Sequence, residues 1–183
     1  DLGMHLDKTK VPGLDASTGS LGHGLPMSLG LGLSARLKNQ SFKTFCLMGD
    51  GECDEGAVWE AAMAIAHFKL TSVIPIVDRN RCMIDGRTSD VMTLEPFVDK
   101  WRAFGYDTIE VDGHDFNELS EVFDDALRAE NKPVAIIANT RKGCGVDFME
   151  DNYLFHYASF DEEKAQICRD EIDRYHDARV AGL

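Results

Sequence analysis

Two short apolar runs in the first half of the chain have the length and composition of buried strands. They are Lys43–Met48 and Ser72–Val77, and a glycine or a charged residue follows each of them. Strands that are apolar at nearly every position are typical of parallel sheets covered by helices. Between the two runs, Glu55–Leu70 has the length of a helix and is apolar or small on nearly every face. This pattern predicts a helix that is buried on several sides.

Strand and helix patterns alternate along most of the chain. The other predicted elements are a glycine-rich loop over Pro12–Pro26, a helix over Ser28–Lys38, a helix over Glu95–Phe104, a strand over Asp107–Val111, a helix over Asn117–Ala129, a strand over Val134–Ala138 and a polar helix from Asp161 to about Val180. Right-handed connections between successive parallel strands place helices on both sides of a sheet. The order therefore predicts an α/β fold, a parallel sheet with helices on both faces.

Length and composition favour a single globular domain over residues 1–183. The chain has 183 residues, of which 44% are hydrophobic, and this is enough to bury a substantial core. We expect residues 157–183 to form a C-terminal helical extension of that domain. The chain begins Asp-Leu-Gly-Met-His, which resembles neither a signal peptide nor a start of translation. We therefore expect an upstream segment to precede it.

The charge and the cysteines restrict the partners and the compartment. The 32 acidic and 19 basic residues give a formal net charge of −13, which repels nucleic acid and anionic lipid. No apolar run reaches transmembrane length, so we expect no nucleic-acid partner and no membrane partner. The five cysteines contain no C-x-x-C pair, which is typical of reduced thiols and predicts a cytoplasmic protein.

Polar side chains follow the first two predicted strands, where ligands bind in such sheets. Asp50 and Gly51 come after the first strand, and Asn80 comes after the second, with 28 residues between Gly51 and Asn80. A carboxylate and an amide oxygen are ligands that Mg²⁺ accepts together with phosphate oxygens. Gly51 lets the backbone approach a phosphate, next to the N-terminus of a helix. Either motif alone is more often an ordinary turn, but their paired spacing favours a cradle for a diphosphate and magnesium.

Two common nucleotide sites are disfavoured, because no G-x-G-x-x-G follows a strand and no G-x-x-x-x-G-K-[ST] occurs. The G-D-G motif and the later Asn instead resemble the thiamine diphosphate signature, and further stretches resemble the transketolase family. They are Ser17–Pro26, Gly49–Gly56, Val58–Ala61, Asp78–Asn80, Asp112–Asp115 and Lys142–Val146, within a similarity that runs from about His5 to His156. The resemblance implies a thiamine diphosphate-binding fold of the diphosphate-binding type, as in the N-terminal subunit of a split transketolase.

The resemblance also implies which residues hold the cofactor, thiamine diphosphate, and its ion. Asp50, the side chain of Asn80 and the backbone carbonyl of Cys82 match metal ligands, with Mg²⁺ as the expected ion and Ca²⁺ as an expected substitute. Gly51 and Asn80 match residues at the diphosphate. Gly19 and Leu21 match the glycine-rich loop that packs around the cofactor.

Three residues match catalytic positions of the family. His5 corresponds to a histidine that lines the sugar channel, although its neighbours Met4 and Leu6 depart from the usual pattern. His156 corresponds to a histidine near the diphosphate and the substrate oxygens, but the tryptophan often found before it is absent. Glu55 corresponds to an acidic residue at the subunit interface that couples to a glutamate of the partner.

The function implied is transfer of a two-carbon ketol unit from a ketose or ketose phosphate to an aldose or aldose phosphate. The family generates the reactive cofactor with a glutamate from a separate pyrimidine-binding domain, which this chain is too short to contain. We therefore expect the partner to be a C-terminal transketolase-type subunit, with assembly as a heterotetramer and docking through the helix Glu55–Leu70. The alternatives are a deoxyxylulose-phosphate synthase-like subunit, a 2-oxo acid dehydrogenase-like subunit, and a noncatalytic regulatory or assembly subunit.

Overall fold

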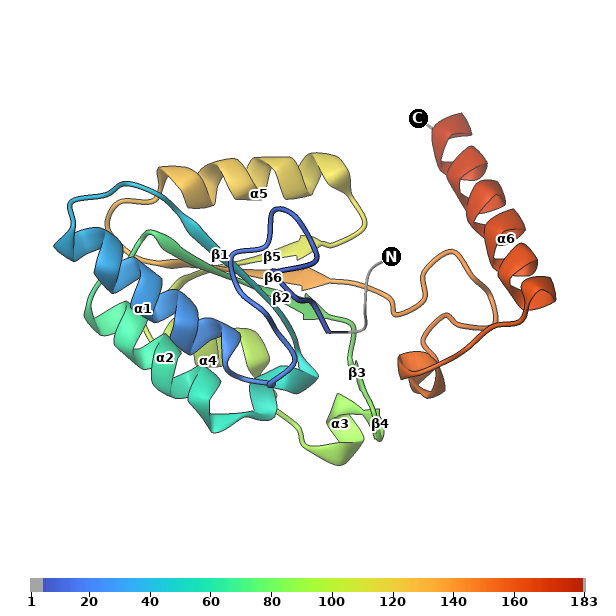
Figure 1. Ribbon diagram of the computed structural model, residues 1–183, viewed down its shortest axis with the longest axis horizontal. Coiled ribbons are helices and arrows are strands. Elements are labelled where there is room, and N and C mark those ends of the chain that lie inside the picture. The colour runs from blue at the N-terminus through green and yellow to red at the C-terminus, as the bar shows by residue number, and fades with distance from the viewer. Residues whose placement is uncertain (1–4, 183) are drawn as a thin grey trace.

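A four-stranded parallel sheet forms the centre of the protein, which is described here by a computed structural model over residues 5–182 (Figure 1). Residues 1–4 and 183 of the expected domain lie outside the described part. The strands are β1 (Thr44–Gly49), β2 (Val73–Arg79), β5 (Asp107–Asp112) and β6 (Val134–Asn139). They lie in the order β1-β2-β6-β5, and all three pairings are parallel. The predicted α/β fold with a parallel sheet is confirmed.

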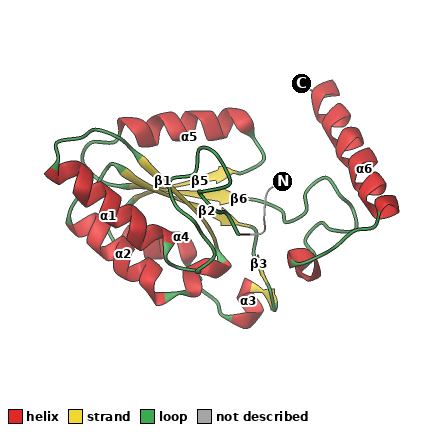
Figure 2. Cartoon of the chain, viewed as in Figure 1, coloured by secondary structure: helices red, strands yellow, loops and turns green. Residues whose placement is uncertain are grey.

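Helices cover both faces of the sheet, as predicted (Figure 2). One face carries three helices, α1 (Gly24–Leu37), α2 (Gly56–His67) and α4 (Phe97–Ala103). Their apolar side chains form one core cluster with the side chains of β1 and β2 that point to this face. The opposite face carries α5 (Phe116–Arg128), which packs in a second cluster against β2, β5 and β6.

Aromatic side chains join α2 to α4 in the larger of these two clusters. The ring centroids of Trp59 and Trp101 lie 5.3 Å apart, and those of Trp59 and Phe104 lie 5.6 Å apart. Tyr106 donates a buried hydrogen bond of 3.1 Å to the carbonyl of Ala62 in α2. These contacts fix the position of α2, and therefore of the turn that precedes it at the end of β1.

Helix α2 differs from its prediction at both ends and in its exposure. It spans Gly56–His67 rather than Glu55–Leu70, and a 3₁₀ turn, η1 (Gly51–Asp54), precedes it. Its residues Val58, Ala61, Ala62 and Ile65 are buried along one side of the helix, whereas burial on several sides was predicted. The side chain of Met63 points to solvent and is 57% exposed. The small residues of α2 therefore pack mainly against this chain's own helices.

Helix α1 begins earlier than predicted, at Gly24 instead of Ser28, so the predicted loop over Pro12–Pro26 ends at His23. Proline is tolerated in the first turn of a helix because its missing N–H has no partner there. Pro26 therefore lies inside α1 rather than marking the end of a loop. The other predicted helices and strands agree with the structure to within about two residues at each end.

Several short elements at the carboxyl end of the sheet were not predicted. They are a hairpin formed by β3 (Cys82–Met83) and β4 (Gly86–Arg87), the helix α3 (Thr88–Val91) and the 3₁₀ turn η2 (Tyr153–His156). Elements of two to four residues are too short to show a hydrophobic period. In Figure 1 the hairpin and α3 lie beyond the tips of the strand arrows, on the side where ligands bind in parallel sheets.

The C-terminal helix α6 (Glu162–Ala181) stands apart from the layered part of the molecule (Figure 1). It has no buried residue, and it contacts the rest of the chain through a few polar bonds. The backbone N–H of Asp147 donates to Glu171 at 3.0 Å, and Arg179 donates to the carbonyl of His114 at 2.5 Å. No helix within residues 5–182 is long and apolar enough to span a membrane.

Candidate functional site

Asp50 lies at the end of β1, and backbone hydrogen bonds connect it to the end of β2. Its backbone N–H donates to the carbonyl of Asp78 at 3.1 Å. Its carboxylate accepts from the N–H of Arg81 at 2.9 Å and from that of Gly51 at 3.1 Å. Only 5% of the residue is exposed. The two loops that the sequence brings to this edge are therefore in direct contact.

The Asp50 carboxylate is a buried charge without a basic partner. No ion pair within the described residues includes it. Burial raises the pKa of Asp50 to about 6, the N–H donors of Arg81 and Gly51 lower that pKa, and the nearby Asp78 carboxylate raises it. A buried carboxylate is costly unless a cation or several donors compensate it. The environment of Asp50 therefore suits a cation.

Asn80 and Cys82 belong to the turn that reaches Asp50. The Asn80 side-chain oxygen accepts from the N–H of Cys82 at 2.9 Å, and its amide nitrogen donates to Asp78 at 3.1 Å. Between them, Arg81 has a left-handed backbone with φ of +61°. This conformation folds the chain tightly enough to direct the Arg81 N–H toward Asp50. The three residues predicted as metal ligands are thus parts of one hydrogen-bonded unit.

These residues fit a hard divalent cation and a diphosphate. Within residues 5–182, no group of three or more His, Cys, Asp or Glu side chains could hold a metal. The expected ligands are different, namely one carboxylate, one amide oxygen and one backbone carbonyl, and oxygen ligands of this kind suit Mg²⁺ when phosphate completes the shell. At Gly51, an added Cβ would lie 2.9 Å from the Cβ of Met83. Glycine is therefore required at the position expected to face the diphosphate.

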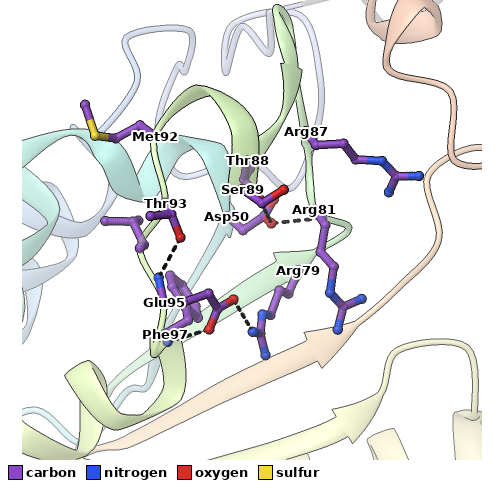
Figure 3. A pocket seen from close by; sticks show the side chains of 11 residues that line it. Asp50, Arg79, Arg81, Arg87, Thr88, Ser89, Met92, Thr93, Glu95 and Phe97 are labelled. Carbon is purple, nitrogen blue, oxygen red and sulfur yellow. Dashed lines mark hydrogen bonds and ion pairs between the residues drawn. The ribbon is translucent and has the colours of Figure 1, made fainter.

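A cavity of about 310 Å³ opens beside Asp50. Figure 3 shows Asp50 near its centre, with the side chains of Arg79 and Arg81 on one side and that of Arg87 on another. Arg79 is anchored by an ion pair of 2.5 Å with Glu95. The cavity is lined by these three arginines and by the two carboxylates of Asp50 and Glu95, so it is a local basic region in a chain of net charge −13.

The glycine-rich loop is held against the turn that follows β1. The N–H of Gly22 donates to one oxygen of Glu52 at 2.9 Å, and the N–H of Gly49 donates to the other at 3.3 Å. Gly22 has φ of +76°, and an added Cβ would lie 2.5 Å from the Cβ of Glu55. Leu21 is 55% exposed at the outer side of this loop. The predicted cofactor loop and the predicted diphosphate turn are therefore packed together.

Sequence reasoning missed the contribution of Glu52. It follows Gly51 directly, but nothing in the spacing indicates that its side chain turns back to a loop 30 residues earlier. The only available signal was an acidic residue that immediately follows a turn expected to bind an anion. A carboxylate at that position repels an anionic cofactor, so its presence there indicates a structural role.

The three predicted catalytic residues lie in three different segments. A Cβ added to Gly19 would lie 2.7 Å from the His5 ring, so that ring rests on the glycine-rich loop. His156 ends η2, which contacts both strands of the β3–β4 hairpin. Glu55 is exposed at the start of α2. No hydrogen bond or ion pair in the described part of the chain joins these three side chains to one another.

The environment of His156 favours a neutral imidazole. Burial lowers the pKa of His156, and the positive charge of Lys142 lowers it further. A neutral imidazole accepts a proton near pH 7, and the imidazolium that forms can give the proton back. This property suits a residue beside reacting oxygens, which is where the family resemblance places His156.

Comparison with known proteins decides the family. Residues 3–177 match the family model described as transketolase, thiamine diphosphate binding domain. The chain belongs to the transketolase family. Its fold is that of the family's thiamine diphosphate-binding domain, since the structure matches transketolase from Campylobacter jejuni with a TM-score of 0.83 and 27% identity over 90% of this chain and 27% of that one. Transketolase from Pichia stipitis, in complex with sedoheptulose-7-phosphate, matches with a TM-score of 0.83 and 25% identity over 92% of this chain and 26% of that one.

Curated relatives of the transketolase family include proteins named as subunits. An apulose-4-phosphate transketolase subunit of Phocaeicola vulgatus is 41% identical over 81% of this chain and 53% of its own length. The 6-deoxy-6-sulfo-D-fructose transketolase subunit SqwG of a Clostridium species is 37% identical over 94% of this chain and 63% of its own length. The chain thus spans between half and two thirds of the length of these relatives.

We expect Gly22→Ala to destabilise the protein. An alanine at φ of +76° is strained, and its Cβ would overlap the Cβ of Glu55, so the free energy of unfolding should fall by about 1–3 kcal/mol. Gly30→Ala is the matched control, because nothing lies within 4 Å of its Cβ position inside α1 and alanine favours helix by up to about 1 kcal/mol. Chemical denaturation of both variants measures the difference. Equal stability of Gly22→Ala and the wild-type chain would contradict this packing of the loop.

Proposed function

We propose that this chain is the diphosphate-binding subunit of a thiamine diphosphate- and Mg²⁺-dependent enzyme that transfers a two-carbon ketol unit from a ketose or ketose phosphate to an aldose or aldose phosphate. The observation that carries the proposal is the buried Asp50 carboxylate, which has no ion pair among residues 5–182 and accepts a hydrogen bond from the turn that bears Asn80. A noncatalytic subunit would have no physical need for such a charge. The proposal treats residues 1–183 as one domain with residues 157–183 as its extension.

In this proposal, oxygen atoms at the ends of β1 and β2 hold the metal. Asp50, the Asn80 side chain and the Cys82 carbonyl bind Mg²⁺, or Ca²⁺ in its place, and Gly51 presents its N–H to the diphosphate. The glycine-rich loop with Gly19 and Leu21 covers the cofactor. When bound, thiamine diphosphate supplies the electron sink for breaking and forming the carbon–carbon bond. The protein supplies binding, orientation and exclusion of water.

Histidines handle protons on the substrate side of the proposed site. His156 is neutral in its resting state, which its lowered pKa supports, so it accepts a proton from a substrate oxygen and returns that proton once it is imidazolium. His5 lies on the glycine-rich loop and lines the path by which the sugar enters. Both residues act on charge that develops at oxygen during the reaction, so they contribute to the rate more than to cofactor affinity.

A partner subunit completes the proposed enzyme, and the relatives named as subunits support this. We place the docking face on α1 and α2 together, because large apolar side chains are exposed on both helices. They are Met27 at 43%, Leu31 at 41% and Met63 at 57%. This surface extends the sequence-based expectation, which named α2 alone. Exposed Glu55 lies at its edge and would reach the partner's catalytic glutamate, in a heterotetramer located in the cytoplasm.

We predict that Asp50→Ala removes metal-dependent binding of thiamine diphosphate. Loss of the only charged ligand should weaken cofactor affinity by about 100-fold, or about 3 kcal/mol. Isothermal calorimetry of the assembled enzyme with cofactor and Mg²⁺ measures the affinity. Asp85→Ala, an exposed residue of the neighbouring hairpin, is the control that should bind normally. Unchanged affinity in Asp50→Ala would rule out the metal assignment.

For His156→Ala in the assembled enzyme, we expect kcat to fall by about 10²- to 10⁴-fold at saturating cofactor, the usual contribution of a positioned acid or base. The KM for thiamine diphosphate should change much less. The control is His176→Ala, which removes an exposed imidazole on α6. Steady-state kinetics with varied cofactor separate the two parameters. A decrease in kcat smaller than about threefold would mean that His156 has only a structural role.

The isolated chain is expected to bind cofactor weakly and to show no ketol transfer until a pyrimidine-domain subunit is added. Size-exclusion chromatography with light scattering, run beside a coupled ketol-transfer assay, tests assembly and activity together. Leu31→Glu places a charge on the proposed docking face and should weaken association at least tenfold. Ile172→Glu on α6 is the control, because Ile172 is 50% exposed and Leu31 is 41% exposed. This variant should associate normally. Full turnover by the chain alone would disprove the partner requirement.

A further inference from the structure

One carboxylate bridges two backbone segments that are far apart in sequence. Glu52 accepts from the N–H of Gly22 at 2.9 Å with one oxygen and from the N–H of Gly49 at 3.3 Å with the other. Gly22 belongs to the glycine-rich loop before α1, whereas Gly49 ends β1. Glu52 itself lies two residues after Asp50. A single side chain therefore connects the loop, the strand end and the turn.

Among the described residues, the loop is otherwise held near the turn through its continuation into α1, which begins at Gly24. The N–H of His23 bonds locally to the carbonyl of Ser20, and the N–H of Thr18 bonds to the carbonyl of Leu6 in the preceding segment. Neither bond reaches β1 or α2. The contact of Gly22 with the Cβ of Glu55 limits how closely the loop can approach, but it does not hold the loop in place. Among the described residues, the bond from the Gly22 N–H to Glu52 is the hydrogen bond that joins the loop directly to the turn.

We propose that Glu52 is a positioning residue that holds the glycine-rich loop at a fixed distance from the Asp50–Gly51 turn and thereby sets the affinity for thiamine diphosphate. This inference rests on the proposed function, because it takes the space between loop and turn as the cofactor site. Both oxygens of Glu52 are occupied by N–H donors of the chain. The residue thus acts on the cofactor through the backbone and is not itself a ligand.

The charge of Glu52 allows a sharp test. Its negative charge near a diphosphate opposes binding, so a purely electrostatic role would make Glu52→Gln bind the cofactor more tightly. If Glu52 instead positions the loop, Glu52→Gln should bind the cofactor more weakly. Glutamine has one acceptor oxygen, so it can serve only one of the two N–H groups and turns its own NH₂ toward the other. Anchoring by Glu52 therefore predicts weaker binding in Glu52→Gln and still weaker binding in Glu52→Ala.

Hydrogen–deuterium exchange of the full chain without cofactor tests the anchor directly. In Glu52→Ala, peptides covering residues 19–24 should exchange at least about tenfold faster, because the Gly22 N–H loses its acceptor. The matched control is Glu118→Ala, since Glu118 accepts from the backbone N–H of Asp112 at the end of β5, at 3.2 Å. That variant should leave residues 19–24 unchanged. Wild-type exchange of this segment in both Glu52 variants would overturn the proposal.

Cofactor kinetics of the assembled enzyme complete the test. The KM for thiamine diphosphate at saturating Mg²⁺ should rise at least about tenfold in Glu52→Ala and by a smaller factor in Glu52→Gln, with kcat at saturating cofactor within about threefold of wild type. An unchanged or lower KM in Glu52→Gln, or an equal loss of kcat, would overturn the positioning role. Failure of the wild-type assembly to bind thiamine diphosphate would instead contradict the proposed function, so the two failures are distinguishable.

Discussion

The hydrogen bond from the Arg81 N–H to the buried Asp50 carboxylate is the contact on which the geometry of the site depends. It joins the loop after β1 to the loop after β2, which are separated by 31 positions in the chain. The left-handed conformation of Arg81 directs its N–H into this bond, and the Asn80 side chain closes the same turn on Cys82. If the Asp50 carboxylate were lost, the two loops would keep their strands but lose their common orientation.

Most of the fold could be predicted because three of the four strands, β1, β2 and β6, are mostly apolar. Runs such as Val134–Ala138 have no polar face, and they alternate with helical segments of ordinary length, so a covered parallel sheet is the simplest arrangement. The hairpin after Cys82 could not be predicted in this way. It consists of two paired residues on each side. Its contacts with η2 and the bonds of its flanking residues, Arg81 and Thr88, to Asp50 determine its position, not a hydrophobic period.

The candidate site could be predicted for those residues whose place in the sequence, directly after a strand, is enough to bring them to the site. Asp50 and Asn80 follow strand ends, and parallel strands bring their carboxyl ends to one edge. Glu52 was not predictable, because its role arises from the direction in which its side chain turns after η1 and from the place where α1 begins. The earlier start of α1 at Gly24 brings Gly22 beside the turn. With the helix predicted to start at Ser28, the sequence did not indicate that Gly22 lies beside this turn.

The electrostatics of the site explain why carboxylates can surround a region that must receive an anion. Asp50 and Glu52 both accept hydrogen bonds from backbone N–H groups. The N–H dipoles offset part of the negative charge of the two carboxylates. Arg79, Arg81 and Arg87 line the same cavity, but no ion pair among the described residues includes Asp50, so its carboxylate keeps part of its negative charge. A diphosphate that enters alone would face the unneutralised Asp50 at short range. A divalent cation changes the sign of the local field, because it is larger in charge than the carboxylate that holds it. Cation and diphosphate should therefore bind with positive coupling, and each should be held more weakly without the other.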